Sequence, residues 1–281
     1  MKKNHLRVAI IGGGHIGQAL ALGLLAGKSV SASQLTISNP HLEELKYMKE
    51  KHKMRITNNN KEAVRSAHII FLTVKAKMVK EVICEVKNSL RKDALLISCA
   101  ACITFKQLET YLQGKSQKMV RIMPNISIRY GRGVVGFIGN KQIDKKDEEL
   151  IKNLLSHLGE AIECRNEKML DKLTLISGCG PGLVGYVMRH FEEIAKTYGF
   201  SQSQTQAIVA ATFSGTLYHL QATRLTTQDL ITHVATKGGI TQEIIQELEE
   251  NNFSLLLAKS IEKGYAKMNN IRKELIHGND R

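Results

Sequence analysis

Short apolar runs alternate with amphipathic stretches over the first half of the chain. The runs Leu6 to Ile11, Leu35 to Ser38 and Ile69 to Val74 each have the length of a β-strand, and residues of helical periodicity separate them. The third run is almost entirely apolar, which is typical of a central strand that is covered on both faces. This alternation predicts βαβ units and a parallel sheet.

The alternation continues to the neighbourhood of residue 165. We expect further strands near 54–57, 95–98, 119–123, 134–138 and 160–164, and helices near 17–26, 42–51, 61–66 and 144–158. Strands and helices that alternate in this way build an open sheet with helices on both faces. The sequence therefore predicts an α/β fold that begins with a Rossmann domain, doubly wound around a mainly parallel sheet, over residues 1–165.

Beyond Asn166 the strand pattern stops. Helical periodicity covers 168–198, 203–223, 227–235, 241–250 and 253–276, so we expect an all-α domain over residues 166–281. These helices carry more apolar residues than a domain of about 115 residues readily buries. We therefore expect a homodimer formed through the C-terminal helices, or a larger oligomer.

Composition narrows the class of protein. Of the 281 residues, 43% are hydrophobic and 23% are charged, as in ordinary globular proteins. No apolar run approaches the roughly 20 residues of a membrane helix, and Arg7 interrupts the N-terminal run too early for a signal peptide. Five cysteines, an odd number, suit free thiols in a reducing compartment. We expect a cytoplasmic protein without a membrane partner.

The formal charge of +14 indicates anionic ligands. The basic residues are dispersed, aromatic residues make up only 5% of the chain, and no nucleic-acid-binding motif accompanies them. We therefore expect no nucleic-acid partner, and small anionic molecules account for the sign of the charge equally well.

The most informative motif is Gly12-x-Gly14-x-x-Gly17, which follows the first predicted strand and opens the first predicted helix. In this context the spacing is a dinucleotide fingerprint. The first glycine permits a tight turn, the second lets backbone N–H groups approach a pyrophosphate, and the third allows close packing of helix and strand. The alternative is that the glycines merely end a strand and start a helix. We predict cofactor contacts at Gly12, Gly14, His15, Ile16 and Gly17.

Cofactor choice depends on the end of the second strand, where an acidic residue would bind the ribose hydroxyls of NAD. The sequence there is Ser38-Asn39-Pro40-His41, without a carboxylate. We therefore expect NADPH, with Ser38 and Asn39 as hydrogen-bonding residues. NADH is the alternative, because no arginine stands there to hold a 2′-phosphate. His41 is either a further phosphate ligand or a solvated residue at the start of a helix.

Five further segments are unusual for simple connectors. They are Thr73-Val74-Lys75, Ser98-Cys99-Ala100-Ala101-Cys102-Ile103, Arg121-Ile122-Met123-Pro124-Asn125, Ser177-Gly178-Cys179-Gly180-Pro181 and Lys237-Gly238-Gly239-Ile240-Thr241. In order and spacing they resemble the pyrroline-5-carboxylate reductase family, whose segments typically read V-K-P, S-I-A-A-G-I, M-P-N-T-P, S-G-S-G-P-A and P-G-G-x-T. The resemblance covers nearly the whole chain. It implies an oxidoreductase of proline biosynthesis that reduces the C=N bond of 1-pyrroline-5-carboxylate with NAD(P)H, and a helical dimerisation domain.

The residues themselves place two of these segments at one edge of the sheet. Val74-Lys75 and Ala100-Ala101 follow strands at the carboxyl ends, where open α/β sheets bind ligands. The alanines would let a nicotinamide ring approach the backbone, or they are small only for packing. Pro124-Asn125 is a rigid turn whose amide holds cofactor or substrate, or only stabilises the turn. We interpret Cys99 and Cys102 as incidental thiols and expect no metal, because no second pair or histidine cluster completes a site.

The resemblance assigns the substrate to Gly238-Gly239-Ile240-Thr241, together with Asn125 and Ser177. N–H groups that precede a helix suit a substrate carboxylate by the same electrostatics that serve a pyrophosphate. Thr241 is the catalytic candidate, because its hydroxyl would hydrogen-bond the imine nitrogen and relay a proton, although no histidine or glutamate is evident beside it. Otherwise Thr241 is simply the N-cap of a helix.

Departures from the family motifs gather on the substrate side. Ile126-Ser127 stands where the family has T-P, Lys237 replaces a proline, Cys179 and Gly182 replace serine and alanine, and Leu225-Thr226-Thr227 stands where E-H-P is often found. Two alternatives therefore stay open. One is a divergent member that reduces another imine or a keto acid, and the other is a cofactor-binding regulatory protein without catalysis.

Glycines also interrupt the first predicted helix of the C-terminal domain. Gly178, Gly180 and Gly182 each cost about 1 kcal/mol against alanine inside a helix, so a break or a close approach is expected there. The related β-hydroxyacid dehydrogenases usually carry a catalytic lysine in a G-x-x-G-x-x-x-K pattern on such a helix. Here Gly182 and Gly185 are followed by Arg189, so that lysine is absent.

Overall fold

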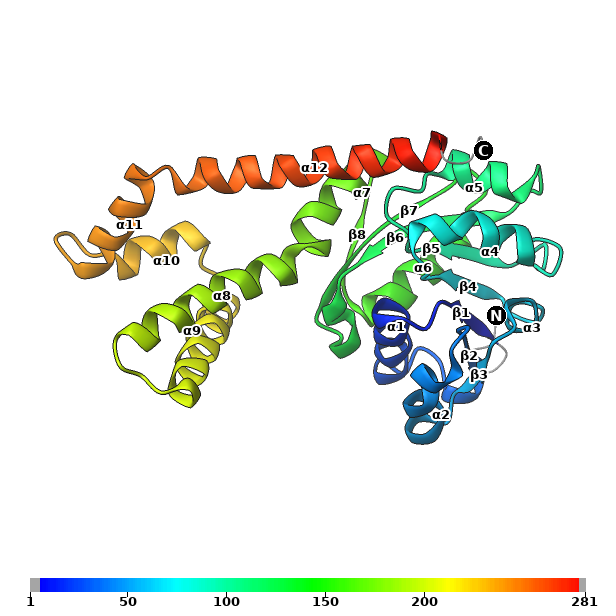
Figure 1. The fold of residues 1–281 in the computed structure, drawn as a ribbon, viewed down its shortest axis with the longest axis horizontal. Helices are drawn as coiled ribbons and strands as arrows, with labels where there is room; N and C mark the ends of the chain where they lie inside the picture. The colour runs from blue at the N-terminus through cyan, green and yellow to red at the C-terminus, as the bar shows by residue number, and fades with distance from the viewer. Residues whose placement is uncertain (1–5, 278–281) are drawn as a thin grey trace. The chain divides into compact units, whose positions relative to one another are not determined.

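The computed structural model describes residues 6–277, and its N-terminal part forms a sheet of eight strands in the order β3-β2-β1-β4-β5-β6-β7-β8 (Figure 1). Neighbouring strands run parallel except β6 and β7, which run antiparallel. The strands are β1 (Val8–Ile11), β2 (Leu35–Ser38), β3 (Arg55–Thr57), β4 (Ile69–Leu72), β5 (Leu95–Ser98), β6 (Lys118–Pro124), β7 (Gly133–Gly139) and β8 (Gly159–Glu163). The strand order reverses beside β1, which confirms the predicted Rossmann architecture.

Helices cover both faces of this sheet. They are α1 (His15–Ala26), α2 (Lys46–His52), α3 (Asn60–Val64), α4 (Val79–Val86), α5 (Phe105–Leu112) and α6 (Lys145–Ser156). Helices α1, α2 and α6 contribute to one apolar core, and α3, α4 and α5 contribute to a second. Alternate residues of β1 divide between the two cores, with Val8 and Ile10 in the first and Ala9 and Ile11 in the second.

Helices α4 and α5 are not among the predicted elements, although both carry a sequence signal. The buried residues of α4 are Val79, Val82, Ile83 and Val86, a spacing that places them on one helical face. Helix α5 begins with a capping box in which Thr104 and Gln107 hydrogen-bond each other's backbone N–H groups. The other predicted strands and helices of this half lie at or close to their expected positions.

The C-terminal part is helical, as predicted. It comprises α7 (Glu167–Leu173), α8 (Gly180–Thr197), α9 (Gln202–Thr223), α10 (Thr227–Val234), α11 (Ile240–Glu250) and α12 (Phe253–His277). The single helix expected over 168–198 is wrong, because a π-helical turn (Thr174–Gly178) separates α7 from α8. In this turn the N–H of Cys179 donates to the carbonyl oxygen of Thr174 at 2.9 Å. The break falls at the glycines that predicted one.

The chain divides into two compact units. The first comprises the residues up to Pro181 together with those from Tyr265 onward, and the second comprises residues 182–264. This division lies later than the domain boundary expected at residue 165. The difference arises because Leu170 of α7 packs with Met123 and Cys164, and because Met268 of α12 is buried.

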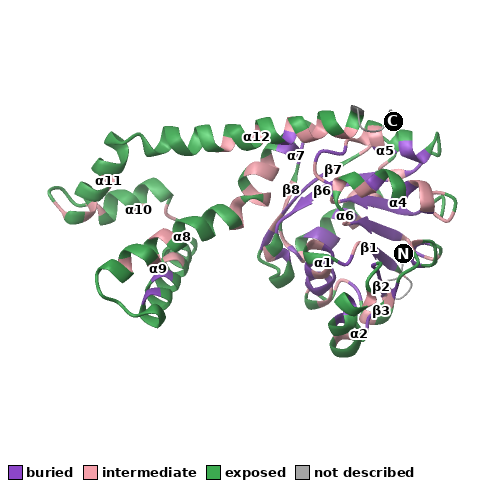
Figure 2. Ribbon diagram, in the orientation of Figure 1, coloured by how far each residue is buried: buried purple, intermediate pink, exposed green. Residues whose placement is uncertain are grey.

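The two units differ strongly in burial (Figure 2). The strands β1, β4 and β5 are buried at every residue. Among residues 182–264, only Thr205 and Val209 are buried. None of the helices between residues 6 and 277 is long and apolar enough to cross a bilayer.

Candidate active site

The three glycines of the fingerprint have different surroundings between β1 and α1. Gly12 has a φ of +104°, and a Cβ there would stand 2.9 Å from the backbone of Thr73 and Val74. A Cβ on Gly17 would lie 2.0 Å from the carbonyl oxygen of Gly12. Around Gly14, nothing lies within 4 Å of the place that a Cβ would take. The fold of the loop therefore requires Gly12 and Gly17, whereas Gly14 leaves open space beside the helix N-terminus.

The N-terminus of α1 can receive an anion. Gly14 is the N-cap and offers no side chain to the N–H groups of the first turn. That turn, which contains His15 and Ile16, carries no acidic residue. The hydroxyl of Thr73 donates to the carbonyl oxygen of Gly12 at 2.6 Å and fixes the loop beside the end of β4. Unpaired N–H groups and the positive end of the helix dipole fit a pyrophosphate.

Ser38 and Asn39 lie at the end of β2, where their side chains are already engaged. Asn39 Oδ1 accepts a hydrogen bond from the N–H of Gly13 at 3.2 Å, and Asn39 Nδ2 donates to the carboxylate of Glu44 at 3.0 Å. The Ser38 hydroxyl donates to Asn60 Oδ1 at 2.7 Å. Asn39 therefore holds the glycine loop, and its amide would have to exchange partners to bind a cofactor phosphate.

Glu44 is an acidic residue at this edge that the sequence pattern does not reveal. It belongs to a 3-10 helix (Leu42–Leu45) beyond the end of β2, and not to the strand end where the fingerprint places an acid. Its exposed side chain nevertheless reaches Asn39. A carboxylate there repels a 2′-phosphate and can accept hydrogen bonds from ribose hydroxyls. His41, the N-cap of the same short helix, is exposed.

The segment after β5 lies at the same edge of the sheet, since β4 and β5 are parallel neighbours. The N–H of Ala100 donates to Ser98 Oγ at 3.3 Å, and Ala101 packs against the cluster of Met123, Cys164 and Leu170. Cys102 has a φ of +68° where the reductase motif has glycine. Burial raises the pKa of the thiols of Cys99 and Cys102, so both stay protonated and are poor redox nucleophiles.

Asn125 and Ser177 are far apart in sequence but adjacent in the structure. Asn125 Nδ2 donates to Ser177 Oγ at 3.3 Å. Asn125 Oδ1 accepts hydrogen bonds from the N–H groups of Ser127 at 3.2 Å and Val134 at 3.4 Å. Ser177 stands in the π-helical turn, so the break between α7 and α8 positions its hydroxyl. Two of the predicted substrate residues thus form one polar group at the end of β6.

Helix α7, which precedes this turn, takes part in a buried ion-pair network. Arg121 of β6 is 1% exposed, pairs with Glu167 at 2.6 Å and lies 3.6 Å from Asp171. Asp171 also pairs with Arg272 of α12 at 2.6 Å. The network joins β6, α7 and the end of α12, and so fixes the strand that presents Asn125.

In the second unit, Gly238 to Thr241 form the turn into α11. The N–H of Gly238 donates to the side chain of Gln242 at 2.6 Å, and the N–H of Gly239 donates to the carbonyl oxygen of Thr236 at 2.9 Å. Gly239 is the N-cap, so Thr241 is the second helical residue and not the cap. Within residues 6–277 the N–H groups of Ile240 and Thr241 have no hydrogen-bond partner. These two N–H groups, in the first turn of α11, are therefore open to a carboxylate.

Thr241 lines a cavity of about 640 Å³ that α9, α10 and α11 form. The walls are mainly apolar, and the polar side chains that line them beside Thr241 are Thr216, His219 and His233. His219 and His233 precede Thr241 in the sequence and belong to other helices, so no motif associates them with it. Only the packing of the three helices brings these residues to one cavity.

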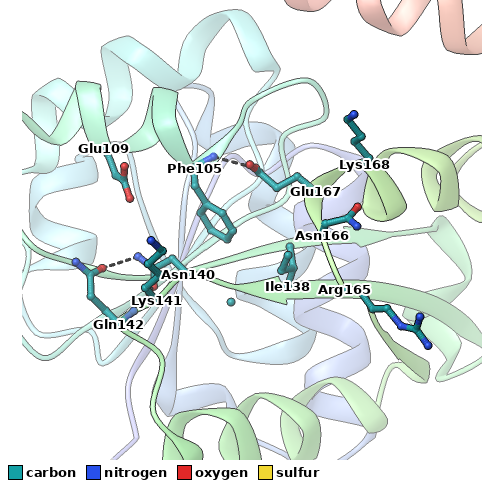
Figure 3. A pocket seen from close by; sticks show the side chains of 11 residues that line it. Phe105, Glu109, Ile138, Asn140, Lys141, Gln142, Arg165, Asn166, Glu167 and Lys168 are labelled. Carbon is teal, nitrogen blue, oxygen red and sulfur yellow. Dashed lines mark hydrogen bonds between the residues drawn. The ribbon is translucent and has the colours of Figure 1, made fainter.

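A cavity of about 950 Å³ in the first unit lies beside α5, β7 and the start of α7 (Figure 3). Phe105 and Ile138 contribute apolar surface to it. Arg165 and Lys168 point away from one another, so the charged groups do not converge. None of the predicted cofactor or substrate residues lines this cavity. We assign no site to it.

No cluster of three or more His, Cys, Asp or Glu side chains that could hold a metal ion occurs in the described part of the chain. The candidate groups described above, each within its own unit, are glycine loops, amides, hydroxyls and imidazoles. Such groups can bind a dinucleotide and orient a small polar substrate.

Two family models match separate parts of the chain. The model described as NADP oxidoreductase, coenzyme F420-dependent, matches residues 7–102, which include the glycine loop and the Ala100 segment. The model described as pyrroline-5-carboxylate reductase dimerisation matches residues 167–271, which include Ser177 and Thr241.

Relatives match nearly the whole length. The pyrroline-5-carboxylate reductases of Pseudomonas aeruginosa and Escherichia coli are 28% and 27% identical, over 91% and 95% of this chain and 93% and 98% of those proteins. The structure of Plasmodium falciparum pyrroline carboxylate reductase with NADP bound is 25% identical, has a TM-score of 0.84, and is covered to 97% by 94% of this chain. A Rossmann half with an intact glycine loop and a helical half with the Thr241 turn occur here in the same order. In both halves and over nearly its whole length, the chain is similar to pyrroline-5-carboxylate reductases.

Proposed function

We propose that this protein reduces the cyclic imine 1-pyrroline-5-carboxylate to L-proline with NADPH. The observation that carries the proposal is the end-to-end match with relatives named for this reaction, which covers at least nine-tenths of both chains. The glycine loop supports it independently, because its geometry leaves space for a pyrophosphate only at Gly14 and the start of α1.

The first unit would hold the cofactor, which supplies a hydride when bound. The pyrophosphate would lie against Gly14, His15 and Ile16 at the start of α1. Val74-Lys75 and Ala100-Ala101 follow parallel strands at the same edge, where a nicotinamide ring would lie. NADPH is supported by the NADP bound to the Plasmodium relative, while Glu44 beside Asn39 would favour NADH. The preference between NADPH and NADH therefore depends on the residues at the end of β2.

Each unit contributes polar groups suited to the substrate. Asn125 and Ser177 supply an amide and a hydroxyl at the end of β6. The N–H groups of Ile240 and Thr241 would bind the carboxylate, and the Thr241 hydroxyl would hydrogen-bond the imine nitrogen. Pro124 fixes the turn that carries Asn125. Holding the imine in a reactive orientation is the main contribution of these residues.

We further propose a homodimer formed by the helices of the second unit. Helix α8 leaves Tyr186, Val187, Phe191 and Ile194 exposed, and none of its residues is buried. Apolar helix surface on this scale is typical of subunit interfaces. A reducing compartment such as the cytoplasm is supported by the five free cysteines.

The test is the absorbance of NADPH after addition of pyrroline-5-carboxylate to the purified protein, with NADH in parallel. We expect substrate-dependent oxidation at about 1 to 1,000 turnovers per second. A protein that binds NADPH tightly but oxidises none with this substrate would contradict the proposal. That outcome would favour a regulatory protein, or a reductase of another imine or a keto acid.

A further inference from the structure

We propose that His219 and His233 supply the proton for imine reduction, which the Thr241 hydroxyl passes to the ring nitrogen. The inference rests on the proposed reductase function and deepens it. It gives the Thr241 turn the acid that its own sequence segment lacks.

The reaction consumes one proton for every hydride. The hydride forms a bond to the imine carbon, the π electrons of the C=N bond take a proton on nitrogen, and the product is a secondary amine. A threonine hydroxyl can pass this proton on, but it cannot remain the source, because it must regain a proton from another group. An imidazolium that becomes imidazole and is reprotonated from solvent completes the balance.

The cavity beside Thr241 contains the groups that such a relay needs. Thr241 on α11, His219 on α9 and His233 on α10 all line the same space of about 640 Å³. Leu230, Ile231, Val234 and Ile245 form apolar walls around them. A mainly apolar cavity with a few polar groups is the usual form of a small-molecule site.

The two imidazoles are the only titratable side chains that line this cavity. Helix α9 contributes one, α10 contributes the other, and α11 contributes Thr241 and Ile245. One turn before His233, Asp229 carries a carboxylate whose pKa is lowered mainly by its hydrogen bonds with Thr226 and also by the charge of His233. An ionised carboxylate therefore lies close enough to His233 to interact with it.

Other charged groups near these helices lie outside the cavity walls. Arg224 at the end of α9, Lys237 before the glycine pair and Glu243 in the first turn of α11 do not line the cavity. His190 of α8 is also outside it and lies 3.9 Å from Glu193. Both His219 and His233 are exposed, and they differ from these other groups in that they line the same cavity as Thr241.

The test replaces His219 and His233 by glutamine, singly and together, and measures kcat from about pH 6 to about pH 9. Glutamine retains a polar side chain of similar size but cannot donate an acidic proton. We expect the wild-type kcat to fall on the alkaline side of this pH range, because the proton donor must be protonated. The double variant should lose about 10- to 100-fold at pH 6.5 and should lack this alkaline limb. If only one of the two single variants loses kcat, the histidine that it replaces is the proton donor.

Two measurements separate proton donation from a structural role. Imidazole added to the buffer should restore part of kcat in a double alanine variant of His219 and His233, which a packing defect would not allow. KM for NADPH, thermal stability and oligomeric state should not change. His190→Gln is the matched control and should leave kcat and its pH profile unaltered.

The outcomes are distinct. The inference is overturned if the double glutamine variant has the wild-type kcat or keeps the alkaline limb. The alkaline limb would then belong to the substrate imine or to another group. The proposed reductase function would still stand. A wild-type protein that binds NADPH without turning over the imine overturns the proposed function itself, and the inference with it.

Discussion

Strand β1 and helix α8 are both rich in apolar residues, yet their environments are opposite. Every residue of β1 is buried between two cores of the first unit, whereas α8 buries none of its residues. The first unit covers its apolar residues with its own helices, and the second unit leaves large apolar side chains exposed. The packing of the first unit can therefore be understood from one chain, while the exposed apolar side chains of the second unit agree with the dimer proposed above.

This contrast predicts different responses to substitution. Substitutions that change only a few atoms should have large effects in the first unit, because its loops and ion pairs are closely packed. In the second unit, substitutions should act mainly by weakening or strengthening the proposed dimer. The following variants test this difference, beginning with the largest expected effect.

Gly17→Ala should abolish cofactor binding and also destabilise the first unit. The new Cβ would lie 2.0 Å from the carbonyl oxygen of Gly12, so α1 or the loop must shift. We expect the Kd for NADPH to rise at least about 100-fold and the free energy of unfolding to fall by about 1–3 kcal/mol. Fluorescence titration with NADPH and urea denaturation measure the two effects.

Gly14→Ala is the matched control for the glycine loop. Its methyl group would enter open space, so the free energy of unfolding should not change. The methyl would however stand where a pyrophosphate approaches, and NADPH affinity should fall by about tenfold or more. If both alanine variants bind NADPH like the wild type, the loop is not the cofactor site.

Arg121→Met should lower the free energy of unfolding by about 3–5 kcal/mol, because it leaves the carboxylates of Glu167 and Asp171 without their buried partner. Urea denaturation measures the change. Lys152→Met removes exposed ion pairs with Glu148 and Glu163 and should have little effect on stability. Equal losses in both variants would contradict the structural role of the buried network.

Val187→Glu should weaken association without affecting the cofactor. The side chain is 40% exposed on α8, and a carboxylate there would have to be buried in the proposed interface. We expect the dissociation constant of the dimer to rise about 100-fold, equivalent to about 3 kcal/mol. Sedimentation velocity measures association, and NADPH titration should give the wild-type Kd. Lys145→Glu on α6 changes charge in the first unit and should leave the oligomer intact.

Glu44→Gln should produce the smallest change, at the ribose end of the cofactor. Removing an exposed negative charge should lower KM for NADPH about two- to fivefold, because only NADPH carries the 2′-phosphate, and should raise KM for NADH, whose ribose hydroxyls lose a carboxylate acceptor. Steady-state kinetics with both cofactors test this. Parallel changes for the two cofactors would mean that Glu44 acts only through Asn39 on the glycine loop.

The sequence predicts most of the first unit because its signals are local. The apolar run at β4, the glycine spacing at α1 and the turn at Asn125 each depend on neighbouring residues, and the structure contains all three. Helices α4 and α5 were equally predictable, from the Val79 to Val86 spacing and from the Thr104 capping box. These features require no knowledge of distant contacts.

The remaining features depend on contacts between segments that are distant in sequence. Glu44 becomes part of the cofactor edge only through its contact with Asn39, and Ser177 joins Asn125 only because the helix widens before α8. His219 and His233 join Thr241 through the packing of three helices. No spacing rule in one sequence can reveal these relations, because each is set by the tertiary fold.

Helix α12 has a consequence for the order in which the protein is made. The chain leaves the first unit at Pro181 and re-enters it at Tyr265, where Met268 becomes buried and Arg272 pairs with Asp171. A ribosome synthesises these residues only after residues 182–264. The nascent cofactor-binding unit must therefore wait, with its sheet already synthesised, until the whole helical insertion has emerged and the C-terminal helix can supply its final contacts.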